Sequence, residues 1–223
     1  MCENGIKVMW VHLNADIPDK TFAQTLQTLP VDWHSDIVKY FQHEDRNRSL
    51  AGKILLVKLL HSLAAVIPGS ITYTNKKKPI IPALPGVDFS ISHSGSIVVC
   101  ALATSGLIGV DIEIHRTLDF LSVKSTMTED QWHNIHLSAR PHETFFDFWT
   151  LKECIAKASG LGLYLPFHDM DISKNPVISE NDHWTHKKIK LNPDYCCHLA
   201  HNRIPTTSIE IQEIDHFNVF LPF

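Results

Sequence analysis

Residues 87–114 read VDFSISHSGSIVVCALATSGLIGVDIEI, and this stretch decides the fold. Apolar and polar residues alternate over its first seven positions, which is typical of a half-buried strand. Turns that contain glycine divide the stretch into three strand-like segments, 87–93, 97–103 and 107–114. These segments predict a β-meander, in which each strand pairs with the next.

Helical periodicity flanks this meander on both sides. Leu50, Ile54 and Val57 recur at intervals of three and four residues and predict a long helix over 44–66. Further helices are predicted over 21–29, 36–41, 129–138 and 143–159, and strands over 7–13 and within 163–223. Long helices combined with antiparallel hairpins predict the α+β class.

The composition is that of a globular protein. The 223 residues are 44% hydrophobic and 20% charged, with a net charge of −4, which excludes disorder as the main state. A nucleic-acid binder would need a strong positive surplus. The first residues do not resemble a signal peptide. The apolar runs are far shorter than the roughly 20 residues that span a bilayer. The five cysteines follow no disulfide pattern. We expect a cytoplasmic protein with reduced thiols and no nucleic-acid or membrane partner.

Two carboxylates share one face of the third predicted strand. Asp111 and Glu113 are two residues apart and project side by side, while Val110 and Ile112 face the core. Adjacent carboxylates repel each other unless solvent or a cation screens them, and a hard divalent ion such as Mg²⁺ is a natural partner. The spacing alone leaves open a second interpretation, the solvated outer face of an edge strand.

Another charged pair lies on the helix predicted over 143–159. Glu153 and Lys157 are one turn apart and share a face, opposite the apolar face that contains Leu151 and Ile155. Taken alone, this spacing indicates an exposed ion pair.

Cations and hydroxyl groups accompany these carboxylates. His93 stands between Ser92 and Ser94 at a strand end, where it can donate to a phosphate or have no role. The three lysines at 76–78 form either a basic patch or a solvated loop. Arg48 lies near the start of the long helix, where an anion is favourable. Together these features predict carboxylates for a metal ion and cations for several phosphates.

The chain contains fifteen histidines, which raises the question of zinc. Segments 133–136, 183–186 and 196–201 each resemble half of a zinc site, but none has a second half at a familiar spacing. Residues 195–200 resemble a strand, which directs Cys196 and His198 to one face and Cys197 to the other. We therefore expect no zinc site, and we assign a role to one histidine, His93.

The motifs in this order resemble the paired signature of the 4′-phosphopantetheinyl transferases of the surfactin-synthetase type. GVDIE at 109–113 and FWTLKECIAK at 148–157 are similar to the family's G-[VI]-D-[IV]-E and W-x-x-K-E-x-x-x-K elements. FSISHSG at 89–95, Lys78-Pro79 and residues 45–60 are similar to three further elements. The resemblance is nearly continuous from about Trp33 to Asp171.

The resemblance implies an α+β fold of two similar α/β subdomains related by a pseudo-twofold, with coenzyme A in the cleft between them. We place the N-terminal subdomain, with the nucleotide and 3′-phosphate contacts, at residues 1–105. The C-terminal subdomain, with the metal and catalytic residues, is placed at residues 106–223. We expect a monomer.

The resemblance also implies a reaction. Coenzyme A donates its 4′-phosphopantetheine arm to a serine of an apo acyl, peptidyl or polyketide carrier protein, and 3′,5′-ADP is released. Asp111, Glu113 and Glu153 are expected to hold Mg²⁺, or Mn²⁺ in its place, at the pyrophosphate. Glu153 is also the expected base for the serine proton, with Glu129 as a rival. Lys157 is expected to contact the pyrophosphate.

Further side chains are expected to bind coenzyme A. Lys152 would support the pyrophosphate beside Lys157. Four residues match positions that hold the nucleotide and its 3′-phosphate: Arg48, Lys78, Ser92 and His93. Relatives often carry two more lysines ahead of the long helix, where this chain offers only Lys39, in a different register. We therefore expect weaker discrimination between coenzyme A and its dephosphorylated form.

Two other functions compete with transfer. A degenerate relative would bind coenzyme A or a carrier protein without turnover, but the intact set of Asp111, Glu113, Glu153 and Lys157 argues against it. A Mg²⁺-dependent pyrophosphate hydrolase often displays glutamate-dense helices, which this sequence lacks.

Overall fold

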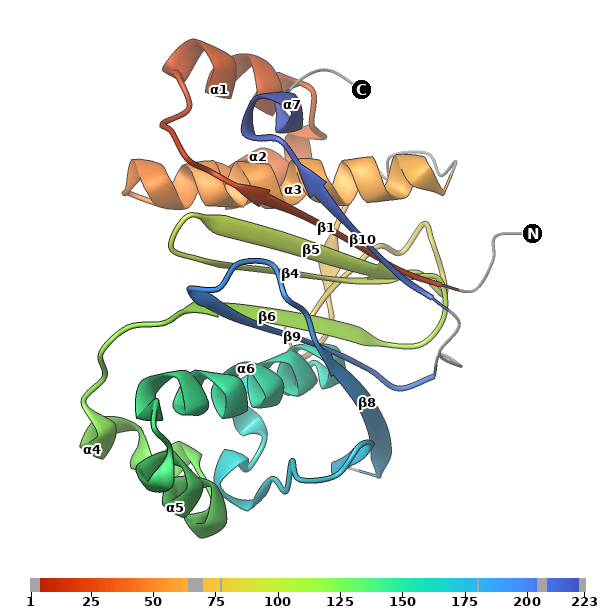
Figure 1. Cartoon of the computed structure of the whole chain (residues 1–223). Coiled ribbons are helices and arrows are strands. Elements are labelled where there is room, and N and C mark those ends of the chain that lie inside the picture. Colours follow the sequence, from red (N-terminus) through yellow and green to blue (C-terminus); the bar gives the residue numbers. More distant parts are fainter. Residues whose placement is uncertain (1–4, 64–69, 77, 180, 204–207, 221–223) are drawn as a thin grey trace.

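Two four-stranded sheets form the centre of the protein (Figure 1). The computed structural model describes residues 5–63, 70–76, 78–179, 181–203 and 208–220. The first sheet has the strand order β10 (Ile209–Ile214), β1 (Ile6–His12), β5 (Ile97–Ala103) and β4 (Asp88–Ser94). The second has the order β6 (Ile108–Ile114), β9 (Tyr195–His201), β8 (Asp182–Lys188) and β7 (Val177–Ser179). A small hairpin joins β2 (Thr72–Tyr73) and β3 (Pro79–Ile80).

The helices are distributed between the two sheets. The N-terminal half contributes α1 (Asp19–Gln27), η1 (Val31–Trp33), α2 (His34–Val38) and α3 (His43–Ser62). The C-terminal half contributes α4 (Phe120–Val123), η2 (Lys124–Thr126), α5 (Glu129–Leu137), α6 (Pro141–Ser159), η3 (Gly162–Tyr164), η4 (Phe167–Asp169) and α7 (His216–Val219). The predicted helices are therefore present, and residues 64–66 of the long one lie outside the described residues.

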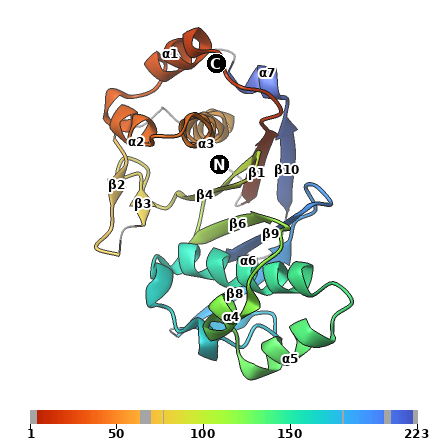
Figure 2. The ribbon, with the colours of Figure 1, turned by 90° about the vertical axis from the view of Figure 1, so that its left-hand side faces the viewer.

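Each sheet is covered by one long helix, and the sheets face each other. Figure 2 shows α3 above the first sheet and α6 below the second. The periodic residues of α3 are buried against β5, and α6 packs on β6 and β9. A third apolar layer, which includes Val99 of β5 and Val110 of β6, lies between the sheets. The α+β class with two similar subdomains is confirmed.

The β-meander prediction is wrong at its third strand. β4 and β5 form the expected hairpin, but β6 pairs with β9 in the second sheet instead of with β5. The chain leaves the first sheet at Gly106, whose φ of +75° suits glycine, and β6 becomes an edge strand. Local turn residues indicate that the chain reverses, but they do not identify the strand with which the next segment pairs.

The edges of β4 and β6 are joined through side chains. Alternate residues of β4 accept hydrogen bonds from backbone N–H groups of β6: Asp88 from Ile108 (2.7 Å), Ser90 from Val110 (3.1 Å), Ser92 from Ile112 (3.4 Å) and Ser94 from Ile114 (3.1 Å). We call this arrangement the β4–β6 seam. It corrects the expectation of a half-buried strand, because three of the four accepting residues, Asp88, Ser90 and Ser92, are only 6% exposed.

Two glycines position α6. A Cβ on Gly109 of β6 would lie 1.9 Å from the carbonyl oxygen of Cys154, so the helix approaches the strand too closely for any other residue. Gly160 ends α6 at φ +71°, as the sequence predicts for the C′ position. The close approach at Gly109 brings the charged face of α6 against the carboxylates of β6.

The last described strand returns to the first sheet. β10 pairs in parallel with β1, and α7 also packs on β1 and α3. The expected boundary near residue 105 falls between β5 and β6, but the segment from 209 onward joins the N-terminal sheet. The two subdomains are thus connected by two crossings of the chain.

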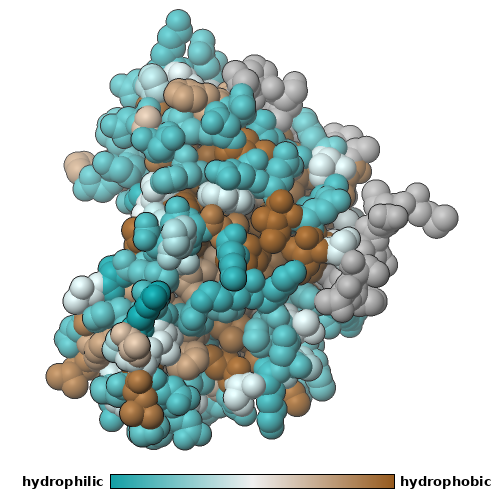
Figure 3. Space-filling model, in the orientation of Figure 1, coloured by the Kyte–Doolittle hydropathy of each residue, from teal (hydrophilic) through white to brown (hydrophobic). Residues whose placement is uncertain are grey.

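The surface is mixed. In the view of Figure 3 hydrophilic residues dominate, and hydrophobic ones show mainly near the centre, at the level of the strands. Cys100, Cys154, Cys196 and Cys197 are free and buried, as expected, and Cys2 lies outside the described residues. In the described part of the chain, no helix has the length and apolarity to cross a membrane.

Candidate functional site

Asp111 is the centre of the predicted carboxylate group. Its side chain points from β6 toward α6 and is 6% exposed, so the solvated-face interpretation is wrong. Oδ1 accepts hydrogen bonds from Ser92 Oγ at 2.8 Å and from Lys157 Nζ at 2.6 Å. Oδ2 is buried and has no hydrogen-bond partner in the structure. An orphaned, buried carboxylate oxygen is costly and indicates a missing cationic partner.

Glu113 and Glu153 complete the group. Ser94 Oγ donates to Glu113 Oε2 at 2.7 Å, and burial raises the pKa of this carboxyl. Burial, followed by the charge of Asp111, raises the pKa of Glu153 to about 6. The negative charges of Asp111 and Glu113 both act on Glu153, so the three carboxyls lie within electrostatic range of one another.

Lys157 lies on this group instead of forming the exposed pair with Glu153 that spacing alone suggested. Its ammonium contacts Asp111 and donates to Ser92 Oγ at 2.8 Å. A cation at this position partly neutralises the carboxylates, and it is available for a phosphate that enters the same space.

The oxygen-only donor set suits a hard divalent cation. Mg²⁺ prefers carboxylate oxygens and keeps several water molecules, so widely spaced carboxylates fit it. The three carboxylates are not tightly clustered. Within the described ranges, the one group of three His, Cys, Asp or Glu side chains with all ligand atoms within 4.8 Å lies elsewhere, at Asp147, Cys196 and His198.

Lys78 lies in the β4–β6 seam. Its Nζ contacts Asp88 Oδ2 at 2.6 Å and donates to the carbonyl oxygens of Ala158 at 2.8 Å and Ile108 at 3.2 Å. Burial lowers the pKa of this ammonium, and Asp88 opposes that effect. All three donors are used within the protein, so Lys78 ties β4, β6 and the end of α6 together.

Arg48 and His93 both line one cavity beside β4. Arg48 donates to the Gly95 carbonyl oxygen at 2.8 Å and pairs with Asp45 at 2.6 Å. The pKa of His93 is lowered, first by desolvation and then by the charges of Arg48 and Lys157. Both charges therefore act on His93, and its neutral imidazole can donate to an anion in the cavity that it shares with Arg48.

Lys152 and Glu129 are not brought to the carboxylate group. Lys152 is completely buried, and its ammonium donates to the carbonyl oxygens of Phe167 at 2.7 Å and Thr126 at 2.8 Å. The helix turns by about 100° per residue, so Lys152 points away when Glu153 points in. Glu129 is exposed in the first turn of α5 and has no hydrogen bond or ion pair with the described site residues.

Two cavities lie next to β4. One, of 530 Å³, is lined by Lys78, Ser90, Lys157 and the η3 segment. The other, of 210 Å³, is lined by Tyr40, Arg48, Ser49, Lys53, Tyr73 and His93. Pro79, Phe89 and Ile91 line both cavities, so the two are neighbours along β4.

Sequence reasoning missed Lys53 in the smaller cavity. Its ammonium lies 5.5 Å from the Trp33 ring centroid, and burial lowers its pKa. Lys53 is five residues after Arg48 on α3, so the two do not share a ridge of an ideal helix and the spacing gave no signal. Lys39, the cation considered from the sequence, pairs with Asp36 at 3.2 Å.

Comparisons with known proteins cover both halves of the chain. Residues 107–207 match the model of the 4′-phosphopantetheinyl transferase superfamily, and residues 17–105 match a model described as 4′-phosphopantetheinyl transferase, N-terminal. The chain is 24% identical to 4′-phosphopantetheinyl transferase Sfp of Bacillus subtilis (75% of this chain, 76% of the relative). It is 26% identical to 4′-phosphopantetheinyl transferase gsp of Aneurinibacillus migulanus (97% and 95%) and 29% identical to 4′-phosphopantetheinyl transferase HetI of Nostoc (73% and 72%).

Both matched models and these relatives agree with the motifs and with the two sheet–helix subdomains. The chain belongs to the 4′-phosphopantetheinyl transferase superfamily, Sfp type, and is an enzyme of that class.

Proposed function

We propose that the protein transfers the 4′-phosphopantetheine group of coenzyme A to a serine of an apo carrier protein, with Mg²⁺ as the metal. The serine oxygen forms a bond to the phosphorus on the pantetheine side of the pyrophosphate. The bond from that phosphorus to the bridging oxygen breaks, and 3′,5′-ADP leaves with the electron pair. The serine proton passes to a base on the enzyme.

The observation that carries this proposal is the unpartnered Oδ2 of Asp111. With Glu113 and Glu153 it supplies oxygen ligands for Mg²⁺, and Mn²⁺ would accept the same set. The bound ion would neutralise charge on the pyrophosphate and on the leaving group.

Glu153 is the proposed base. Without a bound ion, burial and the charge of Asp111 raise the pKa of Glu153 to about 6, so this carboxyl is mostly ionised at neutral pH and can accept a proton. Lys157 can exchange its bond to Asp111 for the pyrophosphate, since its side chain is 32% exposed toward the larger cavity. The exposed position of Glu129 favours Glu153 over Glu129.

We propose that the smaller cavity binds the nucleotide end of coenzyme A. Arg48, Lys53 and His93 offer two cations and one further donor to its phosphates. Lys53 thereby supplies a positive charge that the expected lysines would otherwise have provided. On this basis we revise the expectation of weak discrimination: coenzyme A should bind substantially better than its dephosphorylated form.

A mass-shift assay tests the proposed function. The full chain is incubated with Mg²⁺, coenzyme A and apo acyl, peptidyl and polyketide carrier proteins, and intact carrier mass is measured. Transfer adds one phosphopantetheine to a carrier and releases one 3′,5′-ADP. Binding of coenzyme A without any mass gain would instead support the alternative, a non-catalytic binding module. A monomer, a cytoplasmic location and the absence of nucleic-acid or membrane partners stay predictions.

A further inference from the structure

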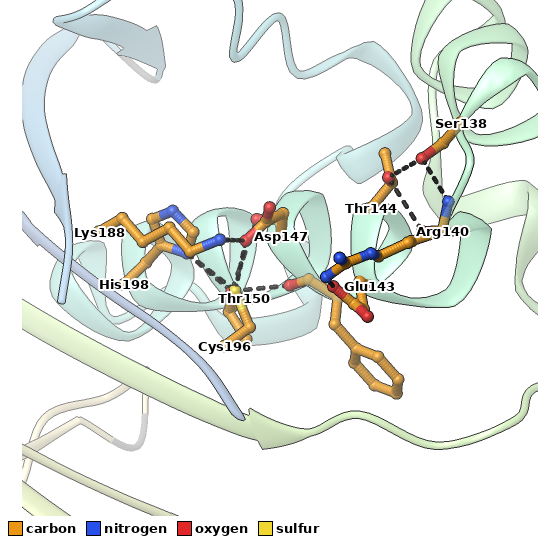
Figure 4. A network of polar contacts seen from close by, with 10 residues as sticks. Ser138, Arg140, Glu143, Thr144, Asp147, Thr150, Lys188, Cys196 and His198 are labelled. Carbon is orange, nitrogen blue, oxygen red and sulfur yellow. Dashed lines mark hydrogen bonds and ion pairs between the residues drawn. The ribbon is translucent and has the colours of Figure 1, made fainter. Parts of the chain in front are cut away.

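A second polar cluster lies beside the carboxylate group, where α6 covers β9: His198 and Cys196 are the cross-strand neighbours of Asp111 and Glu113. Figure 4 shows Asp147 of α6 pointing toward Cys196 and His198, which come from β9. Cys196 Sγ lies 2.6 Å from Asp147 Oδ1 and 3.8 Å from His198 Nδ1. Thr150 Oγ, one turn along α6 from Asp147, lies 2.8 Å from His198 Nδ1.

Strand alternation explains why two of these side chains meet. Cys196 and His198 are two residues apart on β9 and point to the α6 face, whereas Cys197 points into the layer between the sheets. Asp147 faces them from the helix. Segment 196–201 offers only part of a metal site, and the further ligand is Asp147, on a helix almost fifty residues earlier. No sequence motif indicates a metal site whose ligands are so far apart.

We propose that Asp147, Cys196 and His198 form a binding site for Zn²⁺ or a similar borderline transition-metal ion, separate from the Mg²⁺ site. One sulfur, one imidazole nitrogen and one carboxylate oxygen all lie within 4.8 Å of one another. Ligands at about 2.0–2.3 Å from a tetrahedral ion are about 3.3–3.8 Å apart. A thiolate selects such an ion over Mg²⁺, which prefers oxygen.

The cluster needs little movement to accept the ion. The Sγ–Nδ1 separation of 3.8 Å already suits two ligands of one ion. Asp147 must withdraw from Sγ by about 1 Å and release Lys188, and its side chain is 37% exposed. Water can take the fourth position from that open side.

Lys188 competes with the ion. Its ammonium pairs with Asp147, and its side chain is 47% exposed, so it can leave into solvent. The charges then balance, because Zn²⁺ replaces one ammonium and one thiol proton. The products are a zinc ion with one thiolate, one carboxylate and one neutral imidazole, a released proton, and a solvated Lys188.

The protonation states of the ligands are compatible with this exchange. Burial lowers the pKa of His198 to about 4, so the ring is neutral and has a lone pair. Ligation through Nδ1 replaces the contact of this nitrogen with Thr150 Oγ and places the proton on Nε2. Burial raises the pKa of the Cys196 thiol to about 12, so metal binding releases its proton.

The site would join two elements that carry the catalytic group. α6 contributes Glu153 and Lys157, and β9 pairs with β6, which contributes Asp111 and Glu113. A bound ion would link α6 to β9 and so raise the unfolding temperature without entering the reaction.

The test uses the full chain, freed of metal with a chelator and titrated with Co²⁺ as a spectroscopic probe. One equivalent should produce thiolate-to-cobalt absorption, Zn²⁺ should displace it, and excess Mg²⁺ should leave it unchanged. Cys196→Ser should abolish the thiolate band, while Cys197→Ser, the matched control on the opposite face, should retain it. The proposal is overturned if wild type shows no band, if Cys196→Ser retains it, or if Mg²⁺ removes it.

Two further variants keep the test decisive if Cys196→Ser does not fold. Asp147→Asn should weaken Co²⁺ binding at least tenfold, and Lys188→Met should strengthen it, because the competing ammonium is gone. If the cluster is only a polar network that binds no ion, neither Asp147→Asn nor Lys188→Met should change Co²⁺ binding. That result would also overturn the proposal. None of these readouts depends on transfer activity, so the proposed function can fail or hold independently.

Discussion

The ammonium of Lys157 lies 2.6 Å from Asp111 Oδ1, while the other oxygen of the same carboxylate is buried without a partner. The helix and the strand therefore meet in a group that is only partly neutralised. Ser92 contributes a hydroxyl to both residues, which orients Oδ1 and leaves Oδ2 directed at the remaining space. Such an arrangement is suited to receive a cation and the phosphates that accompany it.

Asp111→Asn should remove transfer while leaving the fold intact. The amide keeps the shape and the Ser92 contact but removes the charge that binds Mg²⁺, so we expect at least a ~10²-fold loss of kcat/KM. The free energy of unfolding should change by about 1 kcal/mol or less, because Lys157 can turn to solvent. Asp169→Asn, at a carboxylate that is 70% exposed, is the control and should keep full activity. Unfolding of Asp111→Asn would instead make this carboxylate a structural element.

Lys78→Met should destabilise the protein by about 3–5 kcal/mol, because it leaves the Asp88 carboxylate buried without its ion-pair partner. Lys78→Met combined with Asp88→Asn should recover part of that loss in urea unfolding. Lys76→Met, at an exposed neighbour, is the control and should have no measurable effect. If Lys78→Met were as stable as this control and only raised the KM for coenzyme A, Lys78 would be a nucleotide contact and not a tie across the seam.

Lys152→Met should change how stability depends on pH. The folded-state pKa of Lys152 is lowered to about 8, whereas the unfolded value is near 10.5. Between these values the unfolded chain binds the proton and the folded chain does not, so wild-type stability rises with pH across this window, by up to about 3 kcal/mol. Lys152→Met should lack this rise.

Urea unfolding of both proteins from pH 7.5 to 10 measures the difference. At pH 7.5 the KM for coenzyme A should stay within about twofold of wild type in a folded variant, since the ammonium contacts Thr126 and Phe167. Suppose instead that Lys152→Met shows the same dependence of stability on pH as wild type and a raised KM for coenzyme A. That result would contradict the prediction and support the role at the pyrophosphate that the resemblance implied for Lys152.

Lys53→Met should weaken coenzyme A binding and leave binding of the dephosphorylated form nearly unchanged. Loss of one charge-assisted contact to a phosphate costs about 1.5–3 kcal/mol, or roughly 10- to 150-fold in affinity. Isothermal titration with both ligands measures the ratio, and Lys58→Met, one turn and a half further along α3, is the comparison variant. An equal loss for the two ligands would place the 3′-phosphate elsewhere.

The elements were predictable to the extent that they depend on local pattern. Rules that operate within a few residues explain three features: the alternation in 87–93, the helical period of α3 and the glycine after α6. The corresponding elements β4, α3 and α6 are present in the structure. The pair of Asp111 and Glu113 on one strand face follows from the same kind of rule.

Long-range relationships were not predictable in this way. Serines on β4 look solvated in the sequence, yet they are buried because β6 approaches that edge. The direction of Lys152 depends on which face of α6 packs on the sheet. The tertiary arrangement also decides that Lys53 lines the smaller cavity and that Asp147 contacts Cys196. The sequence contains no short-range signal for either.

The return of β10 to the first sheet has a consequence for protein synthesis. On the ribosome, the strands of the second sheet have all been made once residue 201 is incorporated, whereas the outer edge of β1 has no neighbour until residue 214 follows. During that interval the nascent chain presents an open strand edge, which can pair with other chains. The half that is translated first is therefore the half that is completed last.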